Sequence, residues 1–212
     1  MKIYKLLAGS ILVFSIMNTG HAQTEADVAH LQQRWAEVNY QLESRVQLSA
    51  FEQLIDEVNA LTEAKADSAE LWIWSGIIKS TYAGAKGGLG ALSMAKESKK
   101  DLEQAMEIDT DALSGSAYAS LGTLYFNVPG WPVGFGNDKK AEELLLQALT
   151  LNPEGIDSNY FYGTYLVNEK RYDDARIYLL KAQAANPRPN RPVADAGRQR
   201  EIIEALAEIQ DK

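Results

Sequence analysis

A repeat with a period of 34 residues constrains the fold of this chain more than any other feature of its sequence. Ala141, Leu145, Ala148 and Pro153 recur, each displaced by the same 34 residues, as Ala175, Leu179, Ala182 and Pro187. Alanines spaced three or four residues from a leucine lie on one side of a helix, where a small side chain lets a neighbouring helix approach closely. Each proline follows the last helical turn and stops the helix. The pattern therefore predicts stacked helices built from a repeated unit.

The period is that of a tetratricopeptide repeat, a pair of helices joined by a turn. The expected first helix of three such units carries a glycine between apolar residues, at Gly76, Gly122 and Gly163. The second and third glycines are 41 residues apart and the first and second are 46 apart, which indicates insertions of seven and twelve residues. The shorter insertion falls in residues 128–138, and most of the longer one falls around residues 84–90, which we expect to form a flexible extension between two helices.

The sequence predicts an all-α fold, a right-handed solenoid of about four helix pairs with a C-terminal helix capping the last repeat. The expected helices cover residues 25–43 with 48–65, 69–82 with 91–107, 114–127 with 138–151, 157–168 with 171–185, and finally 193–209. Splitting the solenoid would leave half-buried helix faces without a partner. Residues 23–212 are therefore expected to form a single domain.

The N-terminus is typical of a secretory signal peptide. Lys2 and Lys5 precede an apolar run over residues 6–17, and Gly20 and Ala22 are small residues suited to a peptidase. An apolar core of this length is too short to span a bilayer. We therefore expect residues 1–22 to be cleaved after Ala22, and the mature chain to lie in the bacterial periplasm without insertion in the membrane.

Composition excludes several kinds of function. The formal net charge is −8, and an acidic chain without a recurring basic face is a poor binder of nucleic acid. The absence of cysteine excludes disulfides, thiolate catalysis and a lipid-modified N-terminal cysteine. His30 is the one histidine that remains after signal cleavage, and adjacent acids such as Glu142 and Glu143 splay apart on a helix. We expect no enzyme activity, no cofactor and no metal site.

Two loop segments are candidates for ligand or partner binding. Lys86, Gly87 and Gly88 lie in a glycine-rich stretch that lacks the order of a phosphate-binding loop, although its backbone amides can still present donors to an anion at a helix start. Trp131 and Phe135 lie in a segment rich in glycine and proline. Aromatic residues in such a loop either plug it onto its own domain or bind a partner, and both interpretations stay open for these two.

Two further groups are candidates near the C-terminus. Tyr162 and Tyr165 belong to an aromatic cluster that fits either the core or a cavity of mixed polarity. Arg188, Arg191 and Arg198 concentrate positive charge. They either satisfy helix ends and neighbouring acids, or they form a clamp for a carboxylate or an acidic partner.

Four segments together resemble a particular family of periplasmic proteins: KGGLGAL (86–92), LYFNVPGWPVGFGND (124–138), LNPEGIDSNYFYG (151–163) and RPVADAGRQREI (191–202). They are similar to the T component, TatT, of tripartite ATP-independent periplasmic (TRAP) transporters, over about residues 69–206. The resemblance implies a helical-repeat protein that associates with a periplasmic solute-binding protein, holds a small, partly apolar ligand and self-associates as a trimer. Some members are lipoproteins, which this cysteine-free chain is not expected to be.

Two functions follow, and they predict different concave faces. A non-catalytic adapter resembling the T component needs a closed, largely apolar pocket with few polar anchors. The alternative is a general cell-envelope scaffold that binds a peptide or protein segment, and it needs an open groove lined with Asn, Lys and Arg. In either case the two insertions occupy the same turn of consecutive repeats, so we expect them to be neighbours on one edge of the solenoid.

Overall fold

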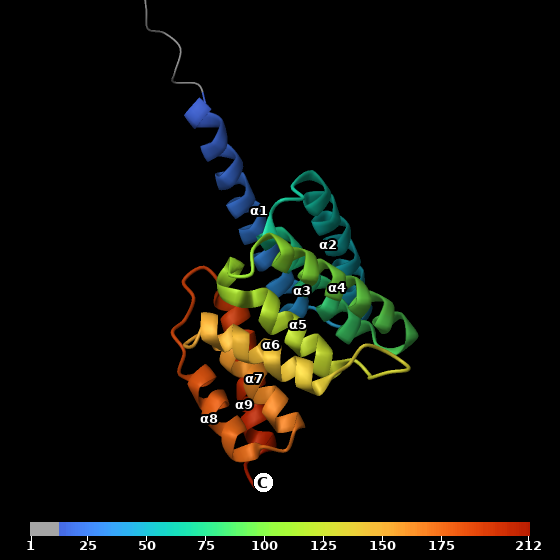
Figure 1. Ribbon diagram of the computed structural model, residues 1–212, viewed down its shortest axis with the longest axis vertical. Helices are drawn as coiled ribbons and strands as arrows, with labels where there is room; N and C mark the ends of the chain where they lie inside the picture. The colour runs from blue at the N-terminus through green and yellow to red at the C-terminus, as the bar shows by residue number, and fades with distance from the viewer. Residues whose placement is uncertain (1–12) are drawn as a thin grey trace, which may run out of the picture.

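The computed structural model describes residues 13–212, with the side chains of residues 21–88 and 90–212. The described residues form nine α-helices and one 3-10 turn, arranged as successive pairs (Figure 1). The helices are α1 (Val13–Gln41), α2 (Ser44–Ala64), α3 (Ala69–Lys86), α4 (Gly88–Ile108), α5 (Ser116–Asn127), α6 (Asp138–Leu151), α7 (Ile156–Asn168), α8 (Tyr172–Gln183) and α9 (Pro192–Glu208), and the 3-10 turn η1 (Ala112–Gly115) precedes α5. The all-α fold predicted from the repeat pattern is confirmed.

The prediction of a flexible extension around residues 84–90 is wrong. The inserted residues lengthen both helices, so that α3 and α4 have 18 and 21 residues, whereas α5 and α6 have 12 and 14. Gly87 alone separates α3 from α4, and its φ of 61° lies in the left-handed region that glycine tolerates best. The chain reverses at this single residue because no side chain opposes that conformation.

The three repeat glycines make the same contact in successive pairs. A Cβ at Gly76 would lie 2.5 Å from Leu102, one at Gly122 would lie 2.8 Å from Leu145, and one at Gly163 would lie 2.9 Å from Leu179. In each pair the backbone of the first helix therefore rests directly on a leucine of the second. This common contact explains why glycine stands at that position in each of these repeats.

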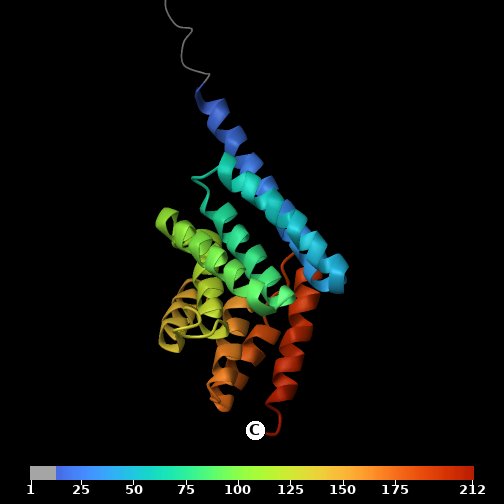
Figure 2. The ribbon, with the colours of Figure 1, turned by 90° about the vertical axis from the view of Figure 1, so that its right-hand side faces the viewer.

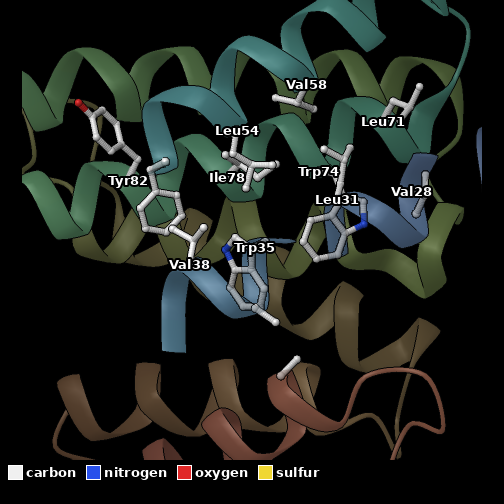
Figure 3. Close-up of a cluster of buried hydrophobic side chains, with 13 residues drawn as sticks. Val28, Leu31, Trp35, Val38, Leu54, Val58, Leu71, Trp74, Ile78 and Tyr82 are labelled. Carbon is white, nitrogen blue, oxygen red and sulfur yellow. The ribbon is translucent and has the colours of Figure 1, made fainter. Parts of the chain in front are cut away.

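The repeat alanines are buried, as their spacing predicted. Ala141, Ala148, Ala175 and Ala182 are at most 1% exposed. Pro153 follows Asn152, the residue that caps α6, and Pro187 follows the end of α8 at Gln183. The cores of the pairs adjoin one another, and Figure 3 shows the N-terminal core, in which Trp35 and Trp74 lie beside the apolar side chains of α1 to α3.

The C-terminal helix makes two contacts, one expected and one not. Ile202 and Ile209 are fully buried against α7 and α8, so α9 caps the last repeat. The same helix also reaches α1, as its position in Figure 2 shows. Gly197 lies against the ring of Tyr40, and Ala194 joins the N-terminal core. The two ends of the solenoid therefore meet.

The predicted signal peptide lies mostly outside the described residues. Helix α1 runs without a break through the expected cleavage point between Ala22 and Gln23. Cleavage and export remain predictions. None of the described helices is long and apolar enough to cross a membrane.

Candidate functional site

Beside the contact between α9 and α1 lies a partly open cavity of about 1100 Å³. Residues of α1, α3, α5, α7 and α9 line it, together with the first part of α4. These are mostly the first helices of their pairs, which face inward, while the second helices lie outside. The cavity therefore combines the inner faces of all the repeats.

One part of the wall is apolar and built from small side chains. Ala83, Ala91, Ala95 and Ala119 come from α3, α4 and α5, and larger apolar groups follow at Ile77, Leu92, Leu113, Leu124, Val128 and Val133. Small side chains leave volume between the helices, and apolar ones make that volume suitable for a hydrocarbon group. This part of the cavity can hold an apolar moiety.

The opposite part, formed by α7, α9 and the segment between α8 and α9, is charged. Asp157 accepts from Arg188 at 2.7 Å and from Arg198 at 2.8 Å. Arg188 also pairs with Asp195 at 2.6 Å, and Arg198 pairs with Glu201. These contacts tie α7 to α9 and fix the polar wall.

The charges of this network set its protonation states. Burial by itself would raise the pKa of Asp157, but attraction from Arg198 and Arg188 outweighs it and holds the pKa far below the ordinary value. Burial likewise opposes the charge of Arg198, and Asp157 reverses that effect and raises its pKa. Both groups therefore stay charged at neutral pH, and the network acts as a fixed frame rather than as an acid or base.

Arg191 differs from its two neighbours. None of the ion pairs among the described residues involves it, and its guanidinium carbon lies 5.3 Å from the centre of the Trp74 ring. Burial and the adjacent Arg188 lower its pKa to about 10. Arg191 still carries a charge at neutral pH, and Asp157 and Asp195 attract that charge without forming an ion pair with it.

The two insertions meet at the rim of the cavity, as predicted from their equivalent turns. A Cβ at Gly134 would lie 3.3 Å from Leu92 near the start of α4, and Lys99 of α4 lies 5.9 Å from the centre of the Phe135 ring. Phe135 packs edge-on against Tyr125 at 5.5 Å and so plugs the loop onto the domain. Trp131 is 90% exposed. One aromatic side chain of the loop thus faces inward and the other faces solvent.

Comparison with known proteins agrees with the repeat geometry. Residues 156–189, which include α7 and α8, match the tetratricopeptide repeat family. This match and the successive helix pairs agree with the fold of an all-α tetratricopeptide-repeat solenoid. Two solved structures are similar, both of MamA: one is 18% identical with a TM-score of 0.46 over 77% of this chain and 88% of that chain. The other is 16% identical with a TM-score of 0.45 over 85% and 91%. No curated protein matches the sequence.

Tetratricopeptide repeats imply a scaffold for contacts between proteins, and such scaffolds are generally not catalysts. His30 lies outside the cavity and pairs with Glu57 of α2 at 2.8 Å. Among the described residues, no group of three or more His, Cys, Asp or Glu side chains is arranged to hold a metal ion.

Six of the predicted binding residues do not line the cavity: Lys86, Gly87, Trp131, Phe135, Tyr162 and Tyr165. Tyr162 and Tyr165 are 4% and 3% exposed, and they stack on each other in the core of the last repeat. Of the two interpretations of these tyrosines, the structure agrees with the core. Lys86 donates to the hydroxyl of Tyr82 at 2.9 Å, on the outside of the hairpin, and Gly87 is exposed beside it. Gly88 does line the cavity.

Several residues that line the cavity were missed from the sequence. Trp35 and Tyr40 come from α1, Trp74 from α3 and Asp157 from α7, and all four line the same volume. The helical periodicity places the two tryptophans on buried faces. It gives no sign that α9 returns to α1, and this contact is what brings the residues around one cavity.

Proposed function

We propose that this chain is a periplasmic, non-catalytic binding adapter that resembles the T component of TRAP transporters. In this proposal the cavity holds a small, partly apolar ligand, and the loop at its rim binds a solute-binding protein. The observation that carries the proposal is the contact of α9 with α1. It brings residues from both ends of the solenoid around one partly open cavity of about 1100 Å³.

The lining of the pocket combines apolar and polar side chains. Ala, Leu, Ile and Val side chains of α3 to α5 lie among Ser, Thr and Asn side chains, and the charged groups come from α7, α9 and the segments beside them. The volume lies in the range typical of small-molecule pockets or slightly above it.

The rim supports a protein partner. Trp131 and Val133 are 90% and 63% exposed on the loop between α5 and α6. Large exposed apolar side chains on a loop that is anchored by its neighbours are typical of binding hot spots. The same loop lines the cavity through Pro129 and Val133, so a partner bound there would contact the mouth of the ligand site.

The proposal is tested by expressing the whole chain, with its N-terminus, in the organism's own envelope or in a related Gram-negative host. Mature protein recovered from the periplasm should begin at Gln23.

Native mass spectrometry should detect a bound small molecule that is released on denaturation. Affinity capture from periplasmic extract should recover a solute-binding protein, and size-exclusion chromatography with light scattering should report a trimer if the family resemblance extends to assembly.

A matched pair of variants separates specific capture from background. Trp131→Ala removes the exposed ring of the rim, and Ile177→Ala removes a 62% exposed side chain on α8, away from the cavity. Capture should be lost in the first and kept in the second. A protein that carries no bound molecule and captures no solute-binding protein would contradict the proposal.

The second candidate is a general cell-envelope scaffold, which the repeat match favours. It predicts capture of other envelope proteins or peptide segments, with no small molecule in the cavity. The two candidates therefore give different results in the same mass-spectrometric measurement.

A further inference from the structure

The loop between α5 and α6 is held in shape by its own backbone. In this rim loop, residues 128–137, the amide of Gly136 donates to the carbonyl of Pro129 at 3.0 Å. The amide of Asn137 donates to the carbonyl of Tyr125 in α5 at 2.8 Å. A Cβ at Gly136 would lie 1.9 Å from a backbone carbonyl oxygen on the other side of the loop, so the two sides are in direct contact. These contacts hold the tip of the loop in place.

The tip carries the most exposed large apolar side chain of the described residues. Trp131 is 90% exposed and Val133 is 63% exposed, on a loop that projects from one side of the molecule (Figure 1). Removing this apolar area from water is favourable, and a rigid loop loses little conformational freedom when it binds. Tryptophan is also enriched at the centres of protein interfaces. The tip is therefore suited to insert into an apolar pocket of a partner.

Exposed lysines stand on both sides of the rim loop. On α4, Lys96 lies one turn from Leu92 and one turn from Lys99, and both of these side chains lie against the loop. On the other side, Lys139 is two residues beyond Asn137, the last residue of the loop and the N-cap of α6. Neither Lys96 nor Lys139 belongs to an ion pair among the described residues. Their charges therefore face solvent beside the exposed indole.

The helices that carry these lysines do not gain stability from them. Lys96 and Lys100 are one turn apart on α4, and like charges at that spacing slightly destabilise a helix. Lys139 lies in the first turn of α6, where the helix dipole favours an acid such as the adjacent Asp138 and opposes a cation. Stability of the helices therefore does not account for these positive charges.

The other carboxylates near the loop leave these lysines unmatched. Glu103 pairs with Lys99 at 2.5 Å, and Glu143 lies 3.7 Å from Lys140. Glu97 is five residues after Leu92, which places it roughly 140° around α4 from the side that meets the loop. The surroundings of the rim loop therefore keep positive charge, on a chain whose formal net charge is −8.

We infer that the rim loop docks into an apolar pocket that is rimmed by carboxylates on the partner protein. The Trp131 indole fills the pocket, and Lys96 and Lys139 face the carboxylates. This inference rests on the proposed function, because it names the chemistry of the surface that the solute-binding protein presents. The carboxylates attract the lysines during approach, and burial of the indole then slows dissociation.

A protein fits this surface better than a membrane does. An anionic leaflet repels a chain whose formal net charge is −8, except within the short range of the lysines themselves. Binding to a lipid interface also grows with the apolar area that is inserted, and this loop offers one large ring. A single indole on a rigid loop instead matches a pocket of defined shape.

The test uses the solute-binding protein that the wild-type chain captures from periplasmic extract, identified by mass spectrometry and then purified. Surface plasmon resonance measures its association and dissociation rates at low and high salt, about 50 and 500 mM NaCl. The double variant of Lys96→Glu with Lys139→Glu reverses the charge beside the loop. The matched control combines Arg45→Glu with Arg200→Glu, because both arginines are exposed, form no ion pair among the described residues and lie on α2 and α9.

At low salt the lysine double variant should associate about tenfold more slowly than the wild type, and high salt should reduce the difference because it screens the attraction. The arginine double variant, with the same change in net charge, should associate close to the wild-type rate. Trp131→Ala should instead speed dissociation by about tenfold or more. Melting temperatures should stay near that of the wild type, since every substituted side chain is exposed.

Association that is insensitive to salt, or equally slow in both double variants, would overturn the inference and leave the adapter role intact. Binding of the wild type to phosphatidylglycerol vesicles that is lost in Trp131→Ala would also overturn it, because the loop would then serve a membrane surface.

Capture of a different envelope protein in place of a solute-binding protein would contradict the adapter role. The same rates are then measured on that protein, and dependence on the two lysines and on Trp131 would support the inference alone. Independence from these side chains would overturn the inference too. Recovery of no protein from the extract would contradict both the adapter role and the inference.

Discussion

Replacing Gly197 by alanine should disrupt the contact that closes the solenoid. A Cβ at this position would lie 2.4 Å from Cγ and Cδ1 of Tyr40 and 2.5 Å from Cδ2. These distances are about an ångström shorter than ordinary contacts between carbon atoms. The ring cannot rotate freely, since its hydroxyl lies 3.3 Å from Glu201 and it packs edge-on against Trp35 at 5.6 Å. Helix α9 must therefore move away from α1.

The expected cost follows from two opposing effects. Overpacking of this kind costs about 1–3 kcal/mol, and alanine regains roughly 0.5–1 kcal/mol over glycine inside a helix. The free energy of unfolding should fall by about 1–2 kcal/mol, which lowers the melting temperature by roughly 2–8 °C in a chain of this size. Ligand affinity should fall as well, because the charged wall of the cavity is carried by α9.

Thermal unfolding followed by circular dichroism measures the effect. Gly84→Ala is the matched control: it is also a helical glycine of the cavity lining, but a Cβ there meets nothing within 4 Å. It should leave stability unchanged or raise it slightly. Tyr40→Ala removes the obstructing ring, so adding Gly197→Ala to that variant should cost nothing further. An equal loss in both backgrounds would refute the reasoning.

Four further outcomes follow from other contacts. Lys79 and Asp101 form an ion pair of 2.6 Å between α3 and α4, with each side chain 7% exposed. Asp101→Ala should therefore cost about 3–5 kcal/mol in urea unfolding, and the double variant with Lys79→Met should cost clearly less. Ala182→Leu should lower stability by about 1–3 kcal/mol by overpacking a fully buried position, as a fall in melting temperature would show. The pKa of Asp157 is lower in the folded chain than in the unfolded chain, so the ionised carboxylate stabilises the fold at neutral pH. This stabilisation is lost as pH falls below the ordinary aspartate pKa. The free energy of unfolding should therefore fall less steeply with acid in Asp157→Asn than in the wild type. Trp131→Ala should abolish partner capture and leave the melting temperature within about 1 °C of the wild type, since the ring is 90% exposed.

The repeat pattern predicted most of the fold because it reports local packing. Gly122 and Ala141 stand where the backbone of one helix meets the side chains of the next, so their spacing indicates both the helices and their pairing. Helix α6 has the bounds expected from the sequence. The length of α3 and α4 was not predicted, because glycines favour a loop unless the neighbouring helix packs along them.

The cavity was predicted less well, because it depends on a contact between the two ends of the chain. Arg188 and Arg198 pair with acids, whereas Arg191 lies between them in sequence and has no carboxylate partner among the described residues. The sequence presents all three as equivalent. They differ in the folded chain because Arg188 and Arg198 lie beside Asp157, whereas Arg191 lies over Trp74. These contacts form only when α7 and α9 fold back toward α3.

Closure of the solenoid by α9 is the central claim, and a distance measurement between α1 and α9 tests it most directly. The chain has no cysteine, so spin labels can be attached to cysteines introduced at Gln33 of α1 and Ala196 of α9, both of which are exposed. Double electron–electron resonance should give one narrow distance distribution, which Gly197→Ala should broaden or lengthen. A broad distribution in the otherwise unmodified chain, unaffected by Gly197→Ala, would contradict the account.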